Sequence, residues 1–293
     1  NDMAVTAALV KELRDKTGLP MMDCKKALTE CDGDTQAAID WLRDRGAEIF
    51  EKRSGRITDF GRFGQYLGLN KAACAMVELK CESAPVTTHE DFIQYADSLA
   101  QAAAENPSAT DADALLALPC PGKGGLTLAE VKDEIFNRIR EVFNIGRIVR
   151  IESGCAGYVH NAGTISGVIL AVEGGDEESA RDICMHIAAM RPTVANPDDL
   201  PHEVVDAERQ SLRDAALAEG KPENIVDQMV EGRMRNFLEN QGVLSEQTYV
   251  KDDSQSVGKF AASKEMKLLQ FVRWELGDDT EESSSIATDD AGE

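Results

Sequence analysis

An α+β fold is predicted for this chain of 293 residues, because the spacing of its apolar side chains changes along the sequence. Residues 4–46 carry apolar residues at helical spacing, whereas alternation with a period of two begins at Arg62. Strand and helix patterns then follow each other as far as the charged, amphipathic region 201–240. A tight turn between the first two strand patterns predicts a hairpin, and therefore antiparallel sheets.

The N-terminal segment is expected to form a bundle of three short helices. Its N-caps are predicted at Thr6, Asp23 and Asp34, whose side-chain oxygens can accept the free N–H groups of a first turn. The third helix is expected to end at Gly46, and Trp41 to be the bulkiest core residue. Such a bundle is close to the lower size limit for independent stability.

The strands and helices of the following core are predicted in order. Strands are expected at Phe63–Leu69 and Ala72–Cys81 with a turn at Asn70-Lys71, then a helix near Asp91–Ala104 and a helix from Thr127 to about Asn144. Strand patterns recur at Arg147–Ser153, Gly167–Glu173 and Leu268–Leu276, and a helix is expected at Glu177–Met190.

A weak internal repeat connects two of these units. Ala75–Cys81 with the helix after it resembles Gly167–Glu173 with the helix at 177–190, but the first copy has a longer strand-to-helix loop, Glu82–Glu90. An enlarged loop in one of two similar units is a frequent place for function, and simple drift in loop length is the alternative.

Seven parts are therefore expected along the chain. They are a helical bundle at 4–46, a linker at 47–61, the first half of the core at 62–146, the second half at 147–195, an antiparallel helical hairpin at 196–245, a return to the core at 246–276 and an acidic disordered tail at 277–293.

Composition argues against two classes of partner. Acidic residues outnumber Lys and Arg by 53 to 31, so the formal net charge is −22, which repels nucleic-acid phosphates and anionic lipid. No apolar run reaches the roughly 20 residues that span a bilayer. Seven cysteines without a CxxC motif indicate buried free thiols in a reducing cytoplasm. A protein partner is the remaining expectation.

Catalytic motifs give little support for an enzyme, a metal site or a cofactor. The four histidines are widely separated, and the glycine-rich run 122–125 does not lie between a strand and a helix as a phosphate-binding loop does. Cys184 and His186 lie on one helix, where a thiol–imidazole dyad rarely forms. An unrelated hydrolase that uses Cys184 nevertheless stays open as an alternative.

Several runs carry a resemblance to a known family. Thr6–Gly18 followed by Met21–Leu28 resembles the opening of bacterial elongation factor Ts, the nucleotide exchange factor for elongation factor Tu. Further similar runs follow in the family's order: Val77–Glu82, Met185–Ala189, Gly220–Pro222, Met229–Met234 and Phe271–Glu275. The likeness covers roughly residues 4–276. It implies a ubiquitin-associated-like bundle, a core of two similar halves and a helical hairpin that projects from it.

The resemblance also implies a function and its residues. A bacterial cytoplasmic factor of this family binds elongation factor Tu in its GDP-bound and nucleotide-free states, without covalent chemistry or a cofactor. It implies that Arg14, Met21 and Met22 contact the partner's GTPase domain and that His160 contacts its third domain. The alternatives are a core methionine pair, a solvated arginine and a loop-packing histidine. Whether the chain forms a homodimer stays open.

One loop departs from the family. Where the family has Thr-Asp-Phe-Val, whose Asp-Phe pair displaces the partner's Mg²⁺, this chain has Ser83, Ala84, Pro85 and Val86. Displacement of Mg²⁺ would then depend on shape, with Pro85 as a rigid apolar wedge assisted by Val86. A string Thr58-Asp59-Phe60 precedes the hairpin and is interpreted as coincidence. A chaperone or scaffold that holds the partner without nucleotide exchange is the alternative function.

Overall fold

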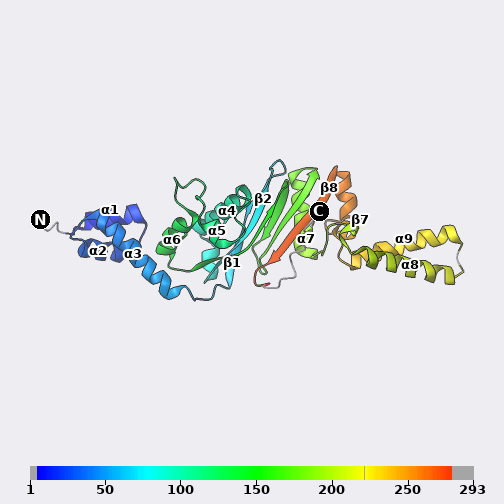
Figure 1. Cartoon of the computed structure of the whole chain (residues 1–293), viewed down its shortest axis with the longest axis horizontal. Coiled ribbons are helices and arrows are strands. Elements are labelled where there is room, and N and C mark those ends of the chain that lie inside the picture. The colour runs from blue at the N-terminus through cyan, green and yellow to red at the C-terminus, as the bar shows by residue number, and fades with distance from the viewer. Residues whose placement is uncertain (1–4, 221, 279–293) are drawn as a thin grey trace, which may run out of the picture. The chain divides into compact units, whose positions relative to one another are not determined.

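A computed structural model describes residues 5–220 and 222–278 (Figure 1). The chain divides into two compact units, and each is described below by itself. The first unit comprises the residues up to Gly64 together with Val77–Ile148, and the second comprises Gln65–Met76 together with the residues from Val149 onwards.

The first unit begins with the predicted three-helix bundle. Its helices are α1 (Ala7–Thr17), α2 (Met21–Glu30) and α3 (Thr35–Arg53). Thr6 caps α1 by accepting the N–H of Leu9 at 3.2 Å, and Gly18 ends it with a left-handed φ of 68°. The buried residues of the bundle core are Val10, Leu13, Leu19, Cys24, Ala27, Leu28, Ala38 and Leu42.

Three details of the bundle differ from the prediction. Pro20, not Asp23, is the N-cap of α2, so the Asp23 carboxylate is left for an ion pair with Arg140. Trp41 is only partly buried at the edge of the core, with the Arg45 guanidinium 5.4 Å from its ring centroid. A Trp that carries a cationic neighbour fits such a half-buried position.

The third difference concerns Gly46, which does not end α3. The helix continues to Arg53, through the first part of the predicted linker. A Cβ at Gly46 would lie 1.9 Å from Oδ1 of Asn137, which belongs to α6 (Leu128–Ile139). Gly46 is therefore needed for the close approach of two helices, a role that looks identical to a helix stop in the sequence.

The rest of the first unit is a sheet with helices. Its strands β1 (Phe60–Tyr66), β2 (Cys74–Cys81) and β3 (Phe143–Ile151) lie in the order β1-β2-β3, with their far ends in the second unit. The helices of this unit are α4 (Glu90–Glu105), α5 (Ala112–Leu116) and α6. At Gly64 a Cβ would lie 2.0 Å from the carbonyl oxygen of Ala96, so α4 packs directly on the β1 backbone.

The predicted end of the helix from Thr127 is wrong. α6 ends at Ile139, because Arg140 adopts a left-handed φ of 64° and the chain turns into β3. Phe143, which was expected inside the helix, is instead buried in the strand and lies edge-on to Phe92, with ring centroids 5.1 Å apart. Burial of this ring outweighs the local helical preference of the segment.

The second unit contains an antiparallel sheet with strand order β4-β5-β8, formed by β4 (Cys155–His160), β5 (Ser166–Gly174) and β8 (Met266–Glu275). Helix α7 (Glu177–Met190) packs on β4 and β5. The predicted strand and helix at 167–190 are confirmed, whereas β4 was not predicted.

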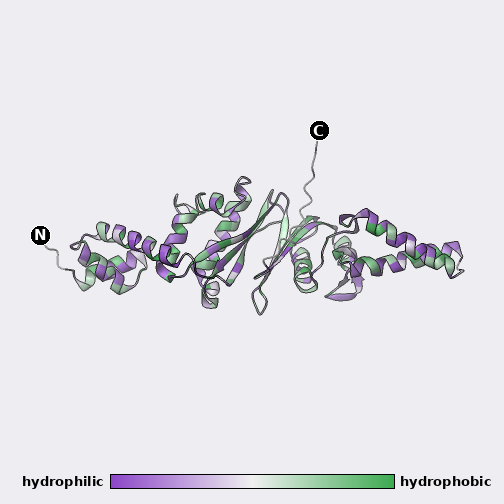
Figure 2. Ribbon diagram, turned by 60° about the horizontal axis from the view of Figure 1, so that its bottom comes forward, coloured by the Kyte–Doolittle hydropathy of each residue, from purple (hydrophilic) through white to green (hydrophobic). Residues whose placement is uncertain are grey.

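A helical hairpin extends from this unit, as predicted. It consists of α8 (His202–Ala218) and α9 (Glu223–Asn240), which pack on each other through Ala216, Val226, Val230 and Met234. Hydrophilic and hydrophobic residues alternate around both helices, as an amphipathic pair requires (Figure 2).

Short elements complete the described chain. They are the 3₁₀ turns η1 (Ala84–Thr88), η2 (Pro197–Asp199) and η3 (Leu244–Glu246), the strands β6 (Thr248–Tyr249) and β7 (Asp252–Ser256), and the helix α10 (Val257–Ser263). None of the helices in 5–220 and 222–278 is long and apolar enough to cross a membrane.

The predicted α+β class is confirmed, with antiparallel pairing in the second sheet. The acidic tail lies outside the described residues, apart from its first two positions. The finer division of the chain into seven parts stays a prediction.

Candidate partner-binding surfaces

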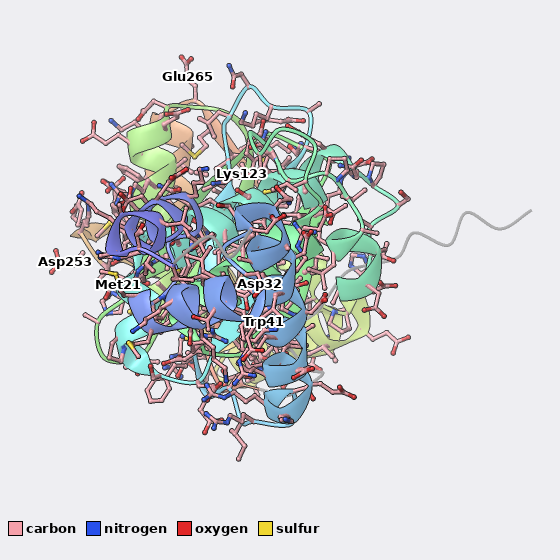
Figure 3. All side chains as sticks on the ribbon, turned by 90° about the vertical axis from the view of Figure 1, so that its left-hand side faces the viewer. Met21, Asp32, Trp41, Lys123, Asp253 and Glu265 are labelled. Atoms are coloured by element: carbon pink, nitrogen blue, oxygen red, sulfur yellow. The ribbon has the colours of Figure 1, made fainter. Side chains whose placement is uncertain are left out.

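The first candidate surface lies around the turn between α1 and α2. Met21 is 46% exposed and Met22 is 72% exposed, although both begin a helix of the bundle. Figure 3 looks onto this bundle and labels Met21 at its surface. Arg14 is exposed in the last turn of α1, so the three predicted side chains flank one short connection. Two exposed methionines form an adaptable apolar contact for a protein partner.

The second candidate surface is the divergent loop, which forms η1 directly after β2. Ala84 and Pro85 are exposed at its start, whereas Val86 is only 7% exposed. The predicted role of Val86 as part of a wedge does not fit this burial, since its side chain holds the loop down from within. The exposed tip consists of Ala84 and Pro85, and the proline ring fixes φ there.

Glu141 holds the start of this loop. Its two carboxylate oxygens accept the backbone N–H of Ser83 at 3.0 Å and the Ser83 hydroxyl at 2.5 Å. Because the hydroxyl is used in this way, Ser83 makes no side-chain cap for η1. Such paired hydrogen bonds to an ionised carboxylate are stronger than neutral ones and fix the direction of the loop.

Glu82 provides a second anchor just before the loop. Its carboxylate accepts the N–H of Val142 at 2.8 Å and the Arg56 guanidinium at 2.8 Å. Partial burial raises the pKa of the Glu82 carboxyl, but these hydrogen bonds and the Arg56 charge outweigh it and leave the pKa below its ordinary value. Glu82 is therefore ionised at neutral pH and keeps both partners.

Cys81 lies beneath the same loop and is a structural thiol. It is fully buried and donates to the carbonyl oxygen of Ser83 at 3.3 Å. Burial raises the pKa of this thiol to about 12. A thiol that stays protonated is a poor nucleophile, so the loop offers no covalent chemistry at this position.

Arg140 is a further residue that sequence reasoning missed. Its guanidinium contacts the Asp23 carboxylate on α2 at 2.9 Å, and its carbonyl oxygen accepts the Arg53 guanidinium at the end of α3. Arg140 therefore contacts the bundle, while the next two residues, Glu141 and Val142, make hydrogen bonds to Ser83 and Glu82 at the start of the loop. No sequence motif indicates this role, because it depends on a left-handed residue between a helix and a strand.

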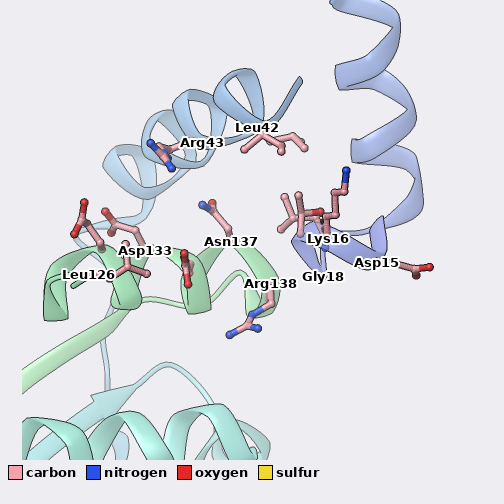
Figure 4. A pocket seen from close by; sticks show the side chains of 14 residues that line it. Asp15, Lys16, Gly18, Leu42, Arg43, Leu126, Asp133, Asn137 and Arg138 are labelled. Atoms are coloured by element: carbon pink, nitrogen blue, oxygen red, sulfur yellow. Dashed lines mark hydrogen bonds between the residues drawn. The ribbon is translucent and has the colours of Figure 1, made fainter. Parts of the chain in front are cut away.

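A cleft of about 460 Å³ lies beside this contact, between the bundle and α6 (Figure 4). Asn137 points from α6 toward α3, and the lining includes Arg43, Asp133 and Arg138. These mixed charges are open to solvent and do not converge on one point. Among the described residues, no group of His, Cys, Asp and Glu side chains is arranged to hold a metal ion.

His160, the fourth predicted contact residue, lies in the second unit at the exposed end of β4. Its Nδ1 is 3.0 Å from the hydroxyl of Tyr158, which sequence reasoning missed. Alternation along a strand places residues two apart on one face, so the period of two at 158–160 is the signal that could have found it. The pair presents two aromatic rings side by side.

His186 and Cys184 do not form a catalytic pair. His186 is fully buried, with Nδ1 accepting the N–H of Val250 at 3.2 Å and Nε2 lying 3.0 Å from the Gln247 amide oxygen. Both ring nitrogens are therefore occupied by structural partners. Burial raises the pKa of the Cys184 thiol well above its ordinary value. The hydrolase alternative has no support at this place.

Replacing His186 by Gln is expected to remove a loss of stability in acid. Burial lowers the pKa of the ring below its ordinary value, although the hydrogen bond to Gln247 opposes part of this shift. The unfolded chain then binds a proton that the folded chain does not, so wild-type stability falls as the pH drops below about 6.5 and is unaffected above it.

Thermal unfolding followed across this pH range checks the prediction. His186→Gln should unfold at a lower temperature than wild type at neutral pH, but with a weaker dependence on acid. His202→Gln, an exposed position on α8, serves as the matched control and should keep the wild-type slope. An unchanged acid slope in His186→Gln would show that other groups cause it.

Comparison with known proteins identifies the family of this chain. The family described as Elongation factor TS matches residues 82–278. The chain is 40% identical over 286 residues to Elongation factor Ts of Methylococcus capsulatus, covering 97% of this chain and 96% of that protein. It is 39% identical to that of Idiomarina loihiensis, covering 95% and 93%, and 40% identical to that of Ruegeria pomeroyi, covering 94% of both.

The match to the Methylococcus capsulatus protein extends over nearly the whole chain, and the family match at 82–278 includes the divergent loop. The chain belongs to the elongation factor Ts family, the translation elongation factors that promote nucleotide exchange without covalent chemistry.

Proposed function

We propose that this protein releases GDP from elongation factor Tu by binding most tightly to its nucleotide-free state. Preference for that state requires, by thermodynamic reciprocity, that the factor weaken GDP binding by the same ratio. No covalent step is needed, because binding energy at several surfaces offsets the cost of deforming the phosphate and Mg²⁺ site. GTP then refills the site and the complex dissociates.

In this proposal, the three-helix bundle provides the main binding contact with elongation factor Tu. Met21 and Met22 bury apolar surface against the partner's GTPase domain, and Arg14 adds a charge at the edge of the contact. The support is their exposure at a helix start, where a core methionine pair would have been buried. His160, with Tyr158 beside it, is proposed to contact the partner's third domain.

In this proposal, the loop at Ser83–Val86 deforms the nucleotide site of elongation factor Tu. The single observation that carries this step is the exposed tip Ala84–Pro85 on a base that Glu141 and Glu82 hold by several hydrogen bonds. A tip that is already rigid loses little conformational freedom when it pushes into a partner, so more of its contact energy can deform that partner. Because Ala84 has no charge, the tip acts by shape.

The uncharged tip also favours a second candidate function. A factor without a carboxylate at this position could hold elongation factor Tu as a chaperone or scaffold and leave its nucleotide in place. The two functions differ in one measurable quantity, the rate of GDP release at saturating factor. They share the bundle contact, so affinity for one state of the partner alone does not separate them, whereas only an exchange factor binds the nucleotide-free state more tightly than the GDP-bound state.

The remaining predictions concern the location of the protein in the cell, the class of its partner and its oligomeric state. A bacterial cytoplasmic location agrees with the seven free cysteines, six of which are buried. The net charge of −22 supports a protein partner in preference to a nucleic acid or a membrane surface. Homodimer formation stays an open prediction.

Release of fluorescent GDP from the cognate elongation factor Tu, measured across a Mg²⁺ titration, tests the proposal. We expect strong acceleration by this protein, and a smaller acceleration at low Mg²⁺, where the metal no longer has to be displaced. Binding without acceleration at any Mg²⁺ concentration would support the scaffold instead. Acceleration that does not depend on Mg²⁺ would remove the metal from the mechanism but keep the exchange.

A further inference from the structure

The segment between α3 and β1 carries apolar side chains that nothing in the first unit covers. Ile57 is 76% exposed and Phe60 is 42% exposed, and both are among the large apolar residues most open to solvent in the described chain. Asp59 between them is also exposed and has no ion-pair partner among the described residues. Scattered exposed apolar residues are ordinary, whereas two within four positions, beside a charge, mark a contact surface more often.

Two hydrogen bonds hold this segment near the divergent loop, and a third holds it to β3. The Arg56 guanidinium contacts the Glu82 carboxylate at 2.8 Å, immediately before the loop begins. The Arg62 guanidinium donates to the carbonyl oxygen of Thr87 at 2.8 Å, near its end. Between these two, the Thr58 hydroxyl accepts from the Asn144 side chain at 3.1 Å.

These contacts place the segment near the loop. The Arg56 and Arg62 side chains reach Glu82 and Thr87, which lie on either side of the loop tip, so residues 56–62 lie close to residues 82–87. Arg56, Ile57, Asp59 and Phe60 are all exposed in this segment, whereas Thr58, which accepts from Asn144, is partly buried.

The interpretation of Thr58-Asp59-Phe60 as coincidence rested on its chain path, because a segment before the hairpin was not expected to reach the loop. The contacts of Arg56 and Arg62 remove that objection. Both arginines flank Asp59 in the sequence and contact residues that flank Ala84 and Pro85, although some 25 positions separate the two segments.

We propose that Ile57, Asp59 and Phe60 form one contact surface with Ala84 and Pro85, and that this surface binds the same GTPase partner. This inference rests on the proposed function and deepens it. The two apolar side chains widen the uncharged tip of the loop, and Asp59 supplies the carboxylate that Ala84 lacks. The occupant is the loop's partner, because the two strips are adjacent and held by shared hydrogen bonds.

The test measures binding and GDP release for Phe60→Ala, Ile57→Ala and Asp59→Asn in the full chain. We expect each apolar truncation to lower the rate of GDP release about fivefold to tenfold, as truncation of a well-placed interface residue does. Thermal unfolding should stay at the wild-type temperature for Ile57→Ala and Asp59→Asn, whose side chains are exposed, and Phe60→Ala is compared with wild type below the unfolding transition of both. Val250→Ala, an exposed residue at 54% outside every proposed surface, is the matched control.

Asp59→Asn separates charge from shape. It keeps the size of the side chain, so a loss of exchange that grows with Mg²⁺ concentration would assign the carboxylate to the metal site. A loss that is the same at every Mg²⁺ concentration would assign it to contact alone, which still supports the surface. Wild-type exchange rates in all three variants would overturn the inference.

The wild-type protein keeps this test independent of the proposed function. If wild type itself does not accelerate GDP release, exchange fails and the surface is judged by affinity for the nucleotide-free partner alone. If wild type accelerates release and the three variants equal it in rate and affinity, only the inference fails. A photo-crosslinker at position 57 adds a direct readout, since the inference requires crosslinks to the GTPase.

Discussion

Replacing Met21 and Met22 together by Asp is expected to weaken binding to elongation factor Tu about 100-fold, because two apolar contacts are lost and two charges must be desolvated. The fold should not suffer. Both positions lie in the first turn of α2, whose N-cap Pro20 makes no side-chain cap, and acidic residues there interact favourably with the helix dipole.

The affinity for nucleotide-free elongation factor Tu, measured by titration, checks this prediction together with thermal unfolding. Val250→Asp introduces the same charge at a comparably exposed residue and should bind like wild type. If the double variant folds normally and keeps wild-type affinity, this surface of the bundle does not provide the main binding contact with elongation factor Tu. A loss of affinity accompanied by unfolding would instead place the methionines in the structural framework.

Replacing Pro85 by Gly is expected to slow GDP release about tenfold with nearly unchanged affinity, because the rigid tip becomes free to move and its ordering opposes deformation of the partner. Stopped-flow release of fluorescent GDP at saturating factor isolates this step from binding. Equal rates for Pro85→Gly and wild type would discard the wedge and leave exchange to the other surfaces.

Glu141→Ala offers a second way to loosen the same tip without altering it. This variant removes both hydrogen bonds to Ser83 and should slow GDP release in the same direction as Pro85→Gly. Glu141→Gln keeps one acceptor and should recover part of the rate. Because Ala84 and Pro85 are intact in both variants, such a recovery would assign Glu141 to positioning of the loop.

Much of the secondary structure could be predicted, because it depends on residues close in sequence. Thr6, Gly18 and Asp34 act as caps where their types indicate, and the two amphipathic helices of the hairpin bury one face each. The errors occur where a distant residue outweighs a local preference. Helix α3 continues through Gly46, where the absence of a Cβ leaves room for the Asn137 side chain. Phe143 fits the helical spacing of the sequence but is buried in strand β3.

The candidate site was predicted only in part for the same reason. Two adjacent methionines at a helix start cannot both face one core, which predicts a surface position for one of them, whereas the structure exposes both Met21 and Met22. Val86 was placed on the wrong side of its loop, because nothing in a short irregular segment indicates which side chain turns inward. Tyr158 beside His160 was missed together with its strand.

By itself, the sequence determined the helical bundle, the strand hairpin, the helical hairpin, the uncharged loop and the family. Periodicity, caps and short runs are local properties, and each can be seen within some ten or twenty residues. Only the tertiary structure decided that Glu141 holds Ser83 across 58 positions, that Arg140 contacts Asp23 of the bundle, and that Arg62 contacts Thr87 in the loop after β2. Contacts of that kind depend on how β1, β2 and α6 pack, and no spacing along the chain encodes them.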